Sequence, residues 1–221
     1  FPIKVFIRNV SSMLNEIKKA NPKVPQLIIL ASSSPRRTAL LQEYDIDHEV
    51  ASSRAEEISF HPDGPLALVM ENAKRKATEV AARFPDRFVL GADTIVSLEE
   101  KVFGKPTDIK NAEQMLMSLS GKTHLVSTGV CLLCKKSGYC ETKVESSEVS
   151  FRELSPEVIQ NYFSFVNPLD KAGSYALQTK PELIVRNFSG SHSNVVGLPM
   201  ELMVQWLKQI VPKLEFVEHD Q

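Results

Sequence analysis

In the first half of the chain, short apolar runs alternate with longer stretches whose apolar residues recur at helical spacing. Gln26–Ala31 is a compact apolar run that fits a buried strand. Ser34 and Pro35 follow as N-cap and first residue of a helix that extends to about Tyr44. The clearest helix is predicted over Pro65–Phe84. Its apolar stripe consists of Leu66, Val69, Met70, Ala73, Ala77, Val80 and Phe84.

The remaining pattern predicts a mixture of strands and helices. Strands are expected at 48–53, 88–98, 124–134, 142–151 and 183–188, and helices at 108–119, 155–165 and 199–210. Early strands alternate with helices and a hairpin occupies the middle, so we expect an α/β fold with a mixed central sheet flanked by helices. Residues 1–25 end in a proline-rich break and are interpreted as an N-terminal appendage, and residues 26–221 as a single domain.

Composition and charge narrow the class of protein. The chain of 221 residues is 43% hydrophobic and 24% charged, and its net charge of −1 argues against a broad nucleic-acid-binding surface. No stretch approaches the ~20 apolar residues that span a bilayer, so no membrane association is expected. Three cysteines are too few for a disulfide framework, which favours a cytoplasmic location. Cys131 and Cys134 should point to opposite faces of one strand, so a metal site there is disfavoured.

The serine-rich turn before the first helix is a candidate phosphate site. A helix N-terminus presents unpaired N–H groups, and here serine hydroxyls and the guanidinium groups of Arg36 and Arg37 surround it. Ordinary helix capping with two solvated arginines is the alternative.

Carboxylates and lysines form a second group of candidates. Asp93 lies within the apolar run 88–98, where a carboxylate is costly unless it is paired, bound to metal or used in catalysis; a strand-end turn is the alternative. Glu56 and Glu57 would add the oxygen ligands that Mg²⁺ or Mn²⁺ prefers, although such pairs are more often solvated. Lys76, at the border of the apolar stripe, and Lys105, in a turn, would neutralise phosphate charge or simply be solvated.

The polar segment 167–178 ends in Gln178, whose amide offers both the donor and the acceptor needed to read a base edge. The sequence contains neither a P-loop nor a GxGxxG motif.

The order of these segments resembles the successive motifs of the Maf family over about residues 26–210. The matching motifs are Ala31-Ser32-Ser33-Ser34-Pro35-Arg36-Arg37, Glu56-Glu57, Ala73-Lys74-Arg75-Lys76-Ala77, Gly91-Ala92-Asp93-Thr94, Gly104-Lys105-Pro106, Leu119-Ser120-Gly121, Asp170-Lys171-Ala172-Gly173-Ser174-Tyr175 and Asn194-Val195-Val196-Gly197-Leu198-Pro199.

The resemblance implies a fold related to the inosine-triphosphate pyrophosphatases, with a cleft between two lobes. It also implies hydrolysis of a nucleoside triphosphate to a monophosphate and diphosphate with Mg²⁺ or Mn²⁺, Co²⁺ being possible. On this basis Asp93 is the catalytic carboxylate and binds the metal with help from Glu56. Lys76 and Lys105 complete the charged cleft. The positions implied in substrate binding and choice are Ser34, Arg36, Arg37, Thr94 and Gln178.

Within the family, the SPRR, GADT and Tyr-x-x-Gln elements resemble the branch that acts on dTTP and UTP. A sister branch that acts on 7-methyl-GTP usually lacks Arg37 and Gln178. Nucleotide-pool house-cleaning is the expected role, and a homodimer is expected from the resemblance. One alternative is a pyrophosphatase that acts on modified or other nucleotides such as 7-methyl-GTP. The alternative from another functional class is a nucleotide-binding regulator of cell division that acts through a protein partner.

Overall fold

The computed structural model describes residues 28–214, and the expected appendage 1–25 lies outside them. Seven strands form one sheet, ordered β2-β1-β3-β5-β6-β7, with β4 paired to β3. The strands are β1 (Ile28–Leu30), β2 (His48–Val50), β3 (Val89–Leu98), β4 (Lys101–Phe103), β5 (Thr123–Cys134), β6 (Tyr139–Phe151) and β7 (Val185–Ser189). β1 runs parallel to β2 and β3, and the other pairs are antiparallel. The prediction of a mixed sheet is confirmed.

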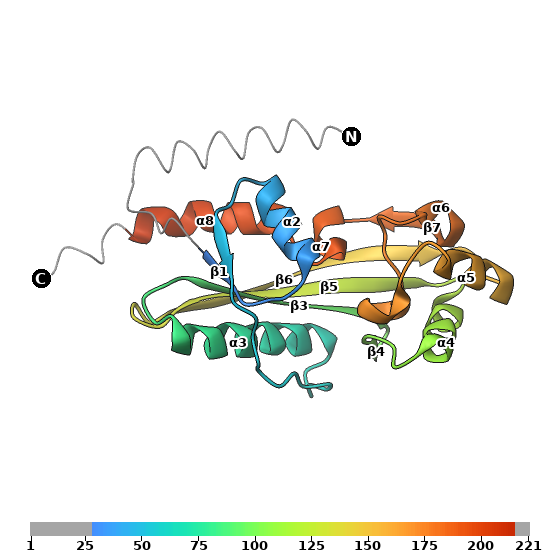
Figure 1. The fold of residues 1–221 in the computed structure, drawn as a ribbon, viewed down its shortest axis with the longest axis horizontal. Coiled ribbons are helices and arrows are strands. Elements are labelled where there is room, and N and C mark those ends of the chain that lie inside the picture. Colours follow the sequence, from blue (N-terminus) through green and yellow to red (C-terminus); the bar gives the residue numbers. More distant parts are fainter. Residues whose placement is uncertain (1–27, 215–221) are drawn as a thin grey trace, which may run out of the picture.

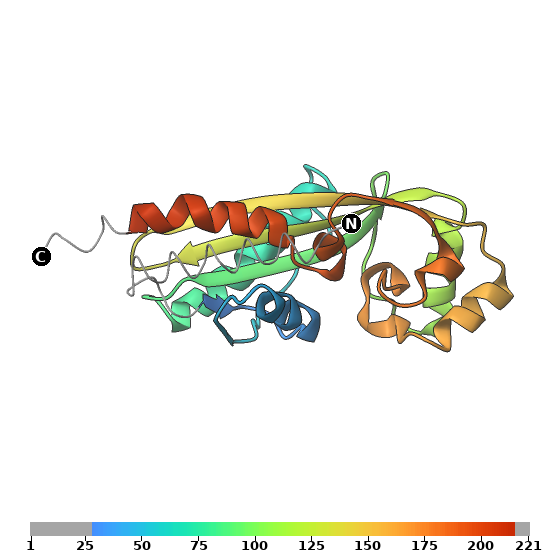
Figure 2. The same cartoon turned by 90° about the horizontal axis from the view of Figure 1, so that it is seen from above.

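Helices cover both faces of this sheet (Figure 1). They are α2 (Pro35–Glu43), α3 (Pro65–Arg83), α4 (Ile109–Leu119), α5 (Pro156–Phe163), α6 (Pro181–Ile184), α7 (His192–Val196) and α8 (Met200–Leu214), with 3₁₀ turns η1 (Pro168–Asp170) and η2 (Ala172–Ser174). α3 lies on one face, and α2 and α8 lie on the other. Figure 2 shows α4, α5 and α6 gathered at the far end of the long strands, as a second lobe with its own apolar cluster.

Several local predictions differ from the structure. β4 and α7 were not predicted, because elements of three and five residues leave little periodic signal. The segment 183–188 divides between α6 and β7, and β6 begins at Tyr139 rather than at 142. Leu66 was expected in the buried stripe of α3, yet it is 43% exposed, whereas Leu68 and Asn72 are buried. The prediction is confirmed for Val69, Ala73, Ala77 and Val80, and the buried face extends to Leu68 and Asn72 instead of Leu66.

Two glycines allow α3 to pack directly against the sheet. A Cβ on Gly91 in β3 would overlap the carbonyl oxygen of Ala73 and lie 2.8 Å from the backbone nitrogen of Ala77. A Cβ on Gly129 in β5 would lie 2.5 Å from the carbonyl oxygen of Val69. Glycine removes the side chain where another backbone must approach. Gly91 and Gly129 thus permit a close backbone approach, which brings polar residues of α3 over the middle of β3.

Cys131 and Cys134 are both buried, but in different apolar clusters on opposite faces of the sheet, as predicted. Across residues 28–214, no helix is both long enough and apolar enough to cross a membrane.

Candidate active site

A cavity of about 720 Å³ lies against the edge of β3. β1 pairs only with Val89 and Leu90 of β3, and β4 pairs with Val96–Leu98. The stretch of β3 between them, which contains Asp93 and Thr94, lines the cavity. The cavity thus begins where parallel strand β1 ends, the usual position of ligand sites in α/β sheets.

The charged side chains that line this cavity, within the described part of the chain, are five cations and three carboxylates. They are Arg36, Arg37, Lys76, Lys105, Lys171, Glu57, Asp93 and Asp170. They come from both lobes, because α2 and α3 contribute from one and the η1–η2 segment from the other. A surplus of cations in a concave site favours an anionic ligand.

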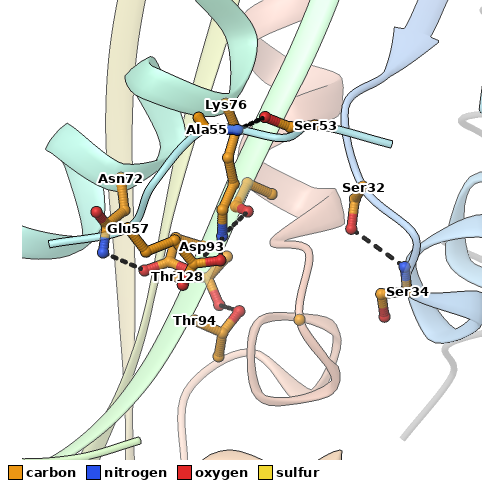
Figure 3. Close-up of polar contacts among 12 residues, drawn as sticks. Ser32, Ser34, Ser53, Ala55, Glu57, Asn72, Lys76, Asp93, Thr94 and Thr128 are labelled. Atoms are coloured by element: carbon orange, nitrogen blue, oxygen red, sulfur yellow. Dashed lines mark hydrogen bonds and ion pairs between the residues drawn. The ribbon is translucent and has the colours of Figure 1, made fainter. Parts of the chain in front are cut away.

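Asp93 and Lys76 form a largely buried ion pair at the floor of the cavity (Figure 3). The Lys76 Nζ atom lies 2.7 Å from Asp93 Oδ1 and 2.9 Å from Glu57 Oε1. The side chains of Asp93 and Lys76 are only 9% and 12% exposed. Asp93 lies within β3, opposite Gly129 of β5, so the strand-end turn is wrong. The burial is tolerated because an ammonium group pairs with the carboxylate.

Asn72 is a contact of Asp93 that sequence reasoning missed. Its Nδ2 donates to Asp93 Oδ2 at 3.2 Å and to the Ile58 carbonyl at 3.0 Å, while its Oδ1 accepts from the Ile58 N–H at 2.9 Å. Asn72 precedes Lys76 by four residues, so both occupy one face of α3. The sequence signal that could have identified Asn72 is its position as a polar residue one helical turn before Lys76.

The two adjacent acidic residues Glu56 and Glu57 differ in their position relative to the cavity. Glu57 lines the cavity and contacts Lys76, whereas Glu56 is exposed and lies outside the lining. No group of three or more His, Cys, Asp or Glu side chains suited to a metal occurs in residues 28–214. The carboxylates of Asp93 and Glu57 nevertheless lie close together, because both contact the ammonium group of Lys76. Two carboxylates fit Mg²⁺, which usually takes one or two from protein and completes its shell with water and phosphate oxygens.

Arg36 and Arg37 are neighbours with different environments. Arg36 is partly exposed at the cavity and crosses to Asp170 of the other lobe, with Nη1 at 3.1 Å from Asp170 Oδ2. Lys171 Nζ lies 2.6 Å from Asp170 Oδ1. Desolvation works to raise the pKa of Asp170, but hydrogen bonds and charge from Lys171 and Arg36 outweigh it, so the pKa lies below its usual value. Asp170 thus stays ionised and holds both cations at the rim.

Arg37 is buried, and each of its three guanidinium nitrogens donates a hydrogen bond to the protein. Its Nε donates to the Gly197 carbonyl at 2.8 Å, Nη1 to Ser32 Oγ at 2.9 Å, and Nη2 to Thr94 Oγ1 at 3.1 Å. Burial lowers the pKa of Arg37, and the Asp93 carboxylate opposes that effect. The alternative of two solvated arginines is therefore wrong for Arg37, which joins α2, β3 and the segment before α8.

The hydroxyl of Thr94 continues this network. Thr94 Oγ1 lies 2.9 Å from Thr128 Oγ1, and Thr128 donates to the Asn194 carbonyl at 2.9 Å. Because Thr128 donates its single hydroxyl proton to that carbonyl, Thr94 must be the donor in the hydrogen bond between the two hydroxyls. Thr94 accepts from Arg37 and donates to Thr128, so only one acceptor lone pair remains for a ligand.

Three other predicted residues also line the cavity. Ser34 is the N-cap of α2, but its hydroxyl makes no capping hydrogen bond, and its N–H donates to Ser32 Oγ at 3.2 Å. Lys105 and Gln178 are exposed at the cavity. Apart from Glu56, every site residue predicted from the sequence thus lies on the cavity wall.

The segment that carries Gln178 is anchored by buried tyrosines. The Tyr162 hydroxyl donates to the Ala176 carbonyl at 3.1 Å and accepts from its N–H at 3.0 Å. The Tyr175 hydroxyl lies 2.8 Å from His124 Nε2, and the two rings pack with Phe151. The contacts of Tyr175 with His124 in β5 and Phe151 in β6 attach this segment to the sheet.

The burial of His124 predicts a pH-dependent stability. Burial lowers its pKa to about 4, from an ordinary value near 6.5. The unfolded chain binds this proton more readily, so the free energy of unfolding should fall as pH drops from 6.5 to 4, by about 3 kcal/mol at about 1.4 kcal/mol per pKa unit. Urea unfolding at pH 7.5 and 4.5 should show a smaller pH dependence for His124→Phe than for the native chain. Equal dependence in both proteins would contradict the assignment.

Comparisons with a protein-family model and with the sequences of known proteins indicate the same family. The family model for Maf-like protein matches residues 27–210. A dTTP/UTP pyrophosphatase of Bacillus cereus (strain G9842) is 46% identical over 82% of this chain and 94% of its own length. A dTTP/UTP pyrophosphatase of Syntrophus aciditrophicus (strain SB) is 43% identical over 83% of this chain and 89% of its own. The structure of the Staphylococcus aureus Ham1 protein aligns with a TM-score of 0.47 at 15% identity, covering 83% of this chain and 98% of that one. By the family match and these identities, the chain belongs to the Maf family.

Proposed function

We propose that this protein hydrolyses nucleoside triphosphates, dTTP and UTP foremost, to the monophosphate and diphosphate. The observation that carries the proposal is the cavity at the β3 edge, where a largely buried Asp93–Lys76 pair, joined by the exposed carboxylate of Glu57, lies beside further cations. The names of the relatives at 43–46% identity support the same reaction.

The cations of both lobes would bind the polyphosphate. Arg36 and the unused hydroxyl of Ser34 lie at the N-terminus of α2, where backbone N–H groups and the helix dipole favour an anion. Lys105 and Lys171 face them from the other lobe. Charges held in place before reaction stabilise the charge that develops on the leaving diphosphate.

Asp93 is suited to accept the proton of the attacking water. Each carboxylate oxygen has two lone pairs, and one on each oxygen is used by Lys76 and Asn72. The other two remain for a water molecule and a divalent cation. In the proposed step the water oxygen bonds to the α-phosphorus, the bond from that phosphorus to the α–β bridging oxygen breaks, and the water proton passes to Asp93.

Asp93 and Glu57 would hold the divalent cation, either Mg²⁺ or Mn²⁺, with Glu57 in the role expected of Glu56. The bound cation supplies neutralisation of phosphate oxygens and a lower pKa for bound water. Lys76 contacts both carboxylates and keeps their mutual repulsion small.

Gln178 is proposed to read the base. Its exposed amide at the cavity offers one acceptor and two donors, which match the N–H and carbonyl groups of a uracil or thymine edge. Arg36 would bind phosphate beside it. Thr94, with its proton committed to Thr128, would contribute by orienting Arg37.

Product analysis with dTTP, UTP, CTP, GTP, ATP and 7-methyl-GTP tests the function, with Mg²⁺, with Mn²⁺ and with EDTA. We expect metal-dependent release of diphosphate and monophosphate chiefly from dTTP and UTP, and no release in EDTA. Release chiefly from 7-methyl-GTP or a purine nucleotide would reject the assignment of Gln178. Tight nucleotide binding without turnover would reject the enzyme and favour a binding regulator.

A further inference from the structure

Asn72 is a polar side chain on the buried face of α3. The residue is only 3% exposed and lies among Leu68, Val69 and Ala73. Burying an amide costs several kcal/mol unless its polar atoms find partners. Apolar residues are typical of the buried face of a helix, so the asparagine calls for an explanation in terms of its contacts.

The contacts determine how the amide is oriented. Its Oδ1 accepts the Ile58 N–H, and its Nδ2 donates one proton to the Ile58 carbonyl and the other to Asp93 Oδ2, at 2.9, 3.0 and 3.2 Å. Rotating the amide by 180° would turn its oxygen toward the Asp93 carboxylate and its NH₂ toward the Ile58 N–H. Both new contacts would be repulsive, so only the observed orientation satisfies every group.

This arrangement connects the two carboxylates of the cavity. Ile58 directly follows Glu57 in the loop, so the paired bonds to Ile58 hold the backbone from which Glu57 extends. The third bond holds the Asp93 carboxylate in β3 (Figure 3). Lys76, one turn further along α3, contacts both carboxylates from the other side. One helix thus sets the separation of Asp93 and Glu57.

We propose that Asn72 is a positioning residue that preorganises Asp93 and Glu57 for a divalent cation. The inference rests on the proposed function in assigning that cation to these carboxylates. Asn72 touches neither substrate nor cation in this scheme; it fixes the oxygens that do. Hydrogen bonds that orient metal-binding carboxylates contribute roughly 10–100-fold to metal affinity or activity.

The test compares Asn72→Leu, which keeps the number and branching of the side-chain heavy atoms but has no hydrogen-bonding group, with Asn111→Leu as matched control. Asn111 lies in the first turn of α4, outside the cavity lining. Mn²⁺ binding is measured by electron paramagnetic resonance without nucleotide, and kcat and KM for dTTP are measured at several Mn²⁺ concentrations. We expect the Mn²⁺ dissociation constant to rise roughly 10–100-fold in Asn72→Leu and to stay unchanged in Asn111→Leu. The KM for dTTP at saturating Mn²⁺ should change less than threefold.

Asn72→Ala provides a second variant if Asn72→Leu fails to fold, because water can enter the smaller side chain's space and pair with the freed groups. Native Mn²⁺ affinity in either folded variant would overturn the proposal. An equal loss in Asn111→Leu would do so as well. Absence of dTTP turnover by the native chain would instead reject the proposed function, while the Mn²⁺ titration would still decide the role of Asn72.

Discussion

Asp93→Asn is expected to lower kcat for dTTP hydrolysis by roughly 10²–10⁴-fold, the range for losing a general base, while the protein stays folded. An asparagine has nearly the same shape and its Oδ1 can still accept from Lys76. It has no charge to accept a proton from water or to attract a divalent cation. Lys76 keeps Glu57 as a charged partner, so the substitution leaves no unpaired buried ammonium.

The measurement is steady-state hydrolysis of dTTP together with thermal unfolding of each protein. Asp63→Asn is the matched control, because the Asp63 side chain is 82% exposed and does not line the cavity. That control should retain native kcat. Native turnover by Asp93→Asn would remove Asp93 from the proposed mechanism, and loss of turnover with loss of folding would assign it a structural role.

Gly91→Val is expected to destabilise the fold by more than the ~1–3 kcal/mol typical of an overpacked core. Its Cβ alone would overlap the Ala73 carbonyl oxygen, which belongs to the backbone of α3 and has no rotamer by which to move away. Relief requires α3 to lift from β3, which would expose Ala73, Ala77 and Val80. It would also draw Asn72 and Lys76 away from Asp93.

Chemical denaturation of Gly91→Val and Gly104→Val separates packing from a general effect of replacing glycine. Gly104 has nothing within 4 Å of a built Cβ and no positive φ, so its variant should retain nearly native stability. If Gly91→Val unfolded at the same denaturant concentration as the native protein, close packing of α3 against β3 would be refuted.

Residue patterns predicted the elements whose signal is local. The apolar run around Asp93 was interpreted as a strand and the stripe after Pro65 as a helix, and both are confirmed as β3 and α3. A carboxylate in a strand that is otherwise apolar is conspicuous without coordinates, because its burial needs a reason. Local backbone geometry imposes these periods, so they can be read from neighbouring residues alone.

The different environments of adjacent residues of the same type were decided by the tertiary structure. Arg36 and Arg37 are equivalent in composition, yet Arg37 is enclosed by Ser32, Thr94 and Gly197 while Arg36 reaches Asp170 134 positions away. Glu56 and Glu57 lie in a loop without periodicity, and contact with Lys76 selects Glu57.

The contacts of Asn72 could likewise not be predicted from the sequence, because its partners Ile58 and Asp93 come from a loop and a strand on either side of α3 in the chain. The sequence by itself determined the types of the longer elements, the family resemblance and the presence of an unusual carboxylate. Tertiary structure decided the contacts around that carboxylate, because Asn72 and Lys76 reach Asp93 only where α3 packs closely against Gly91 and Gly129.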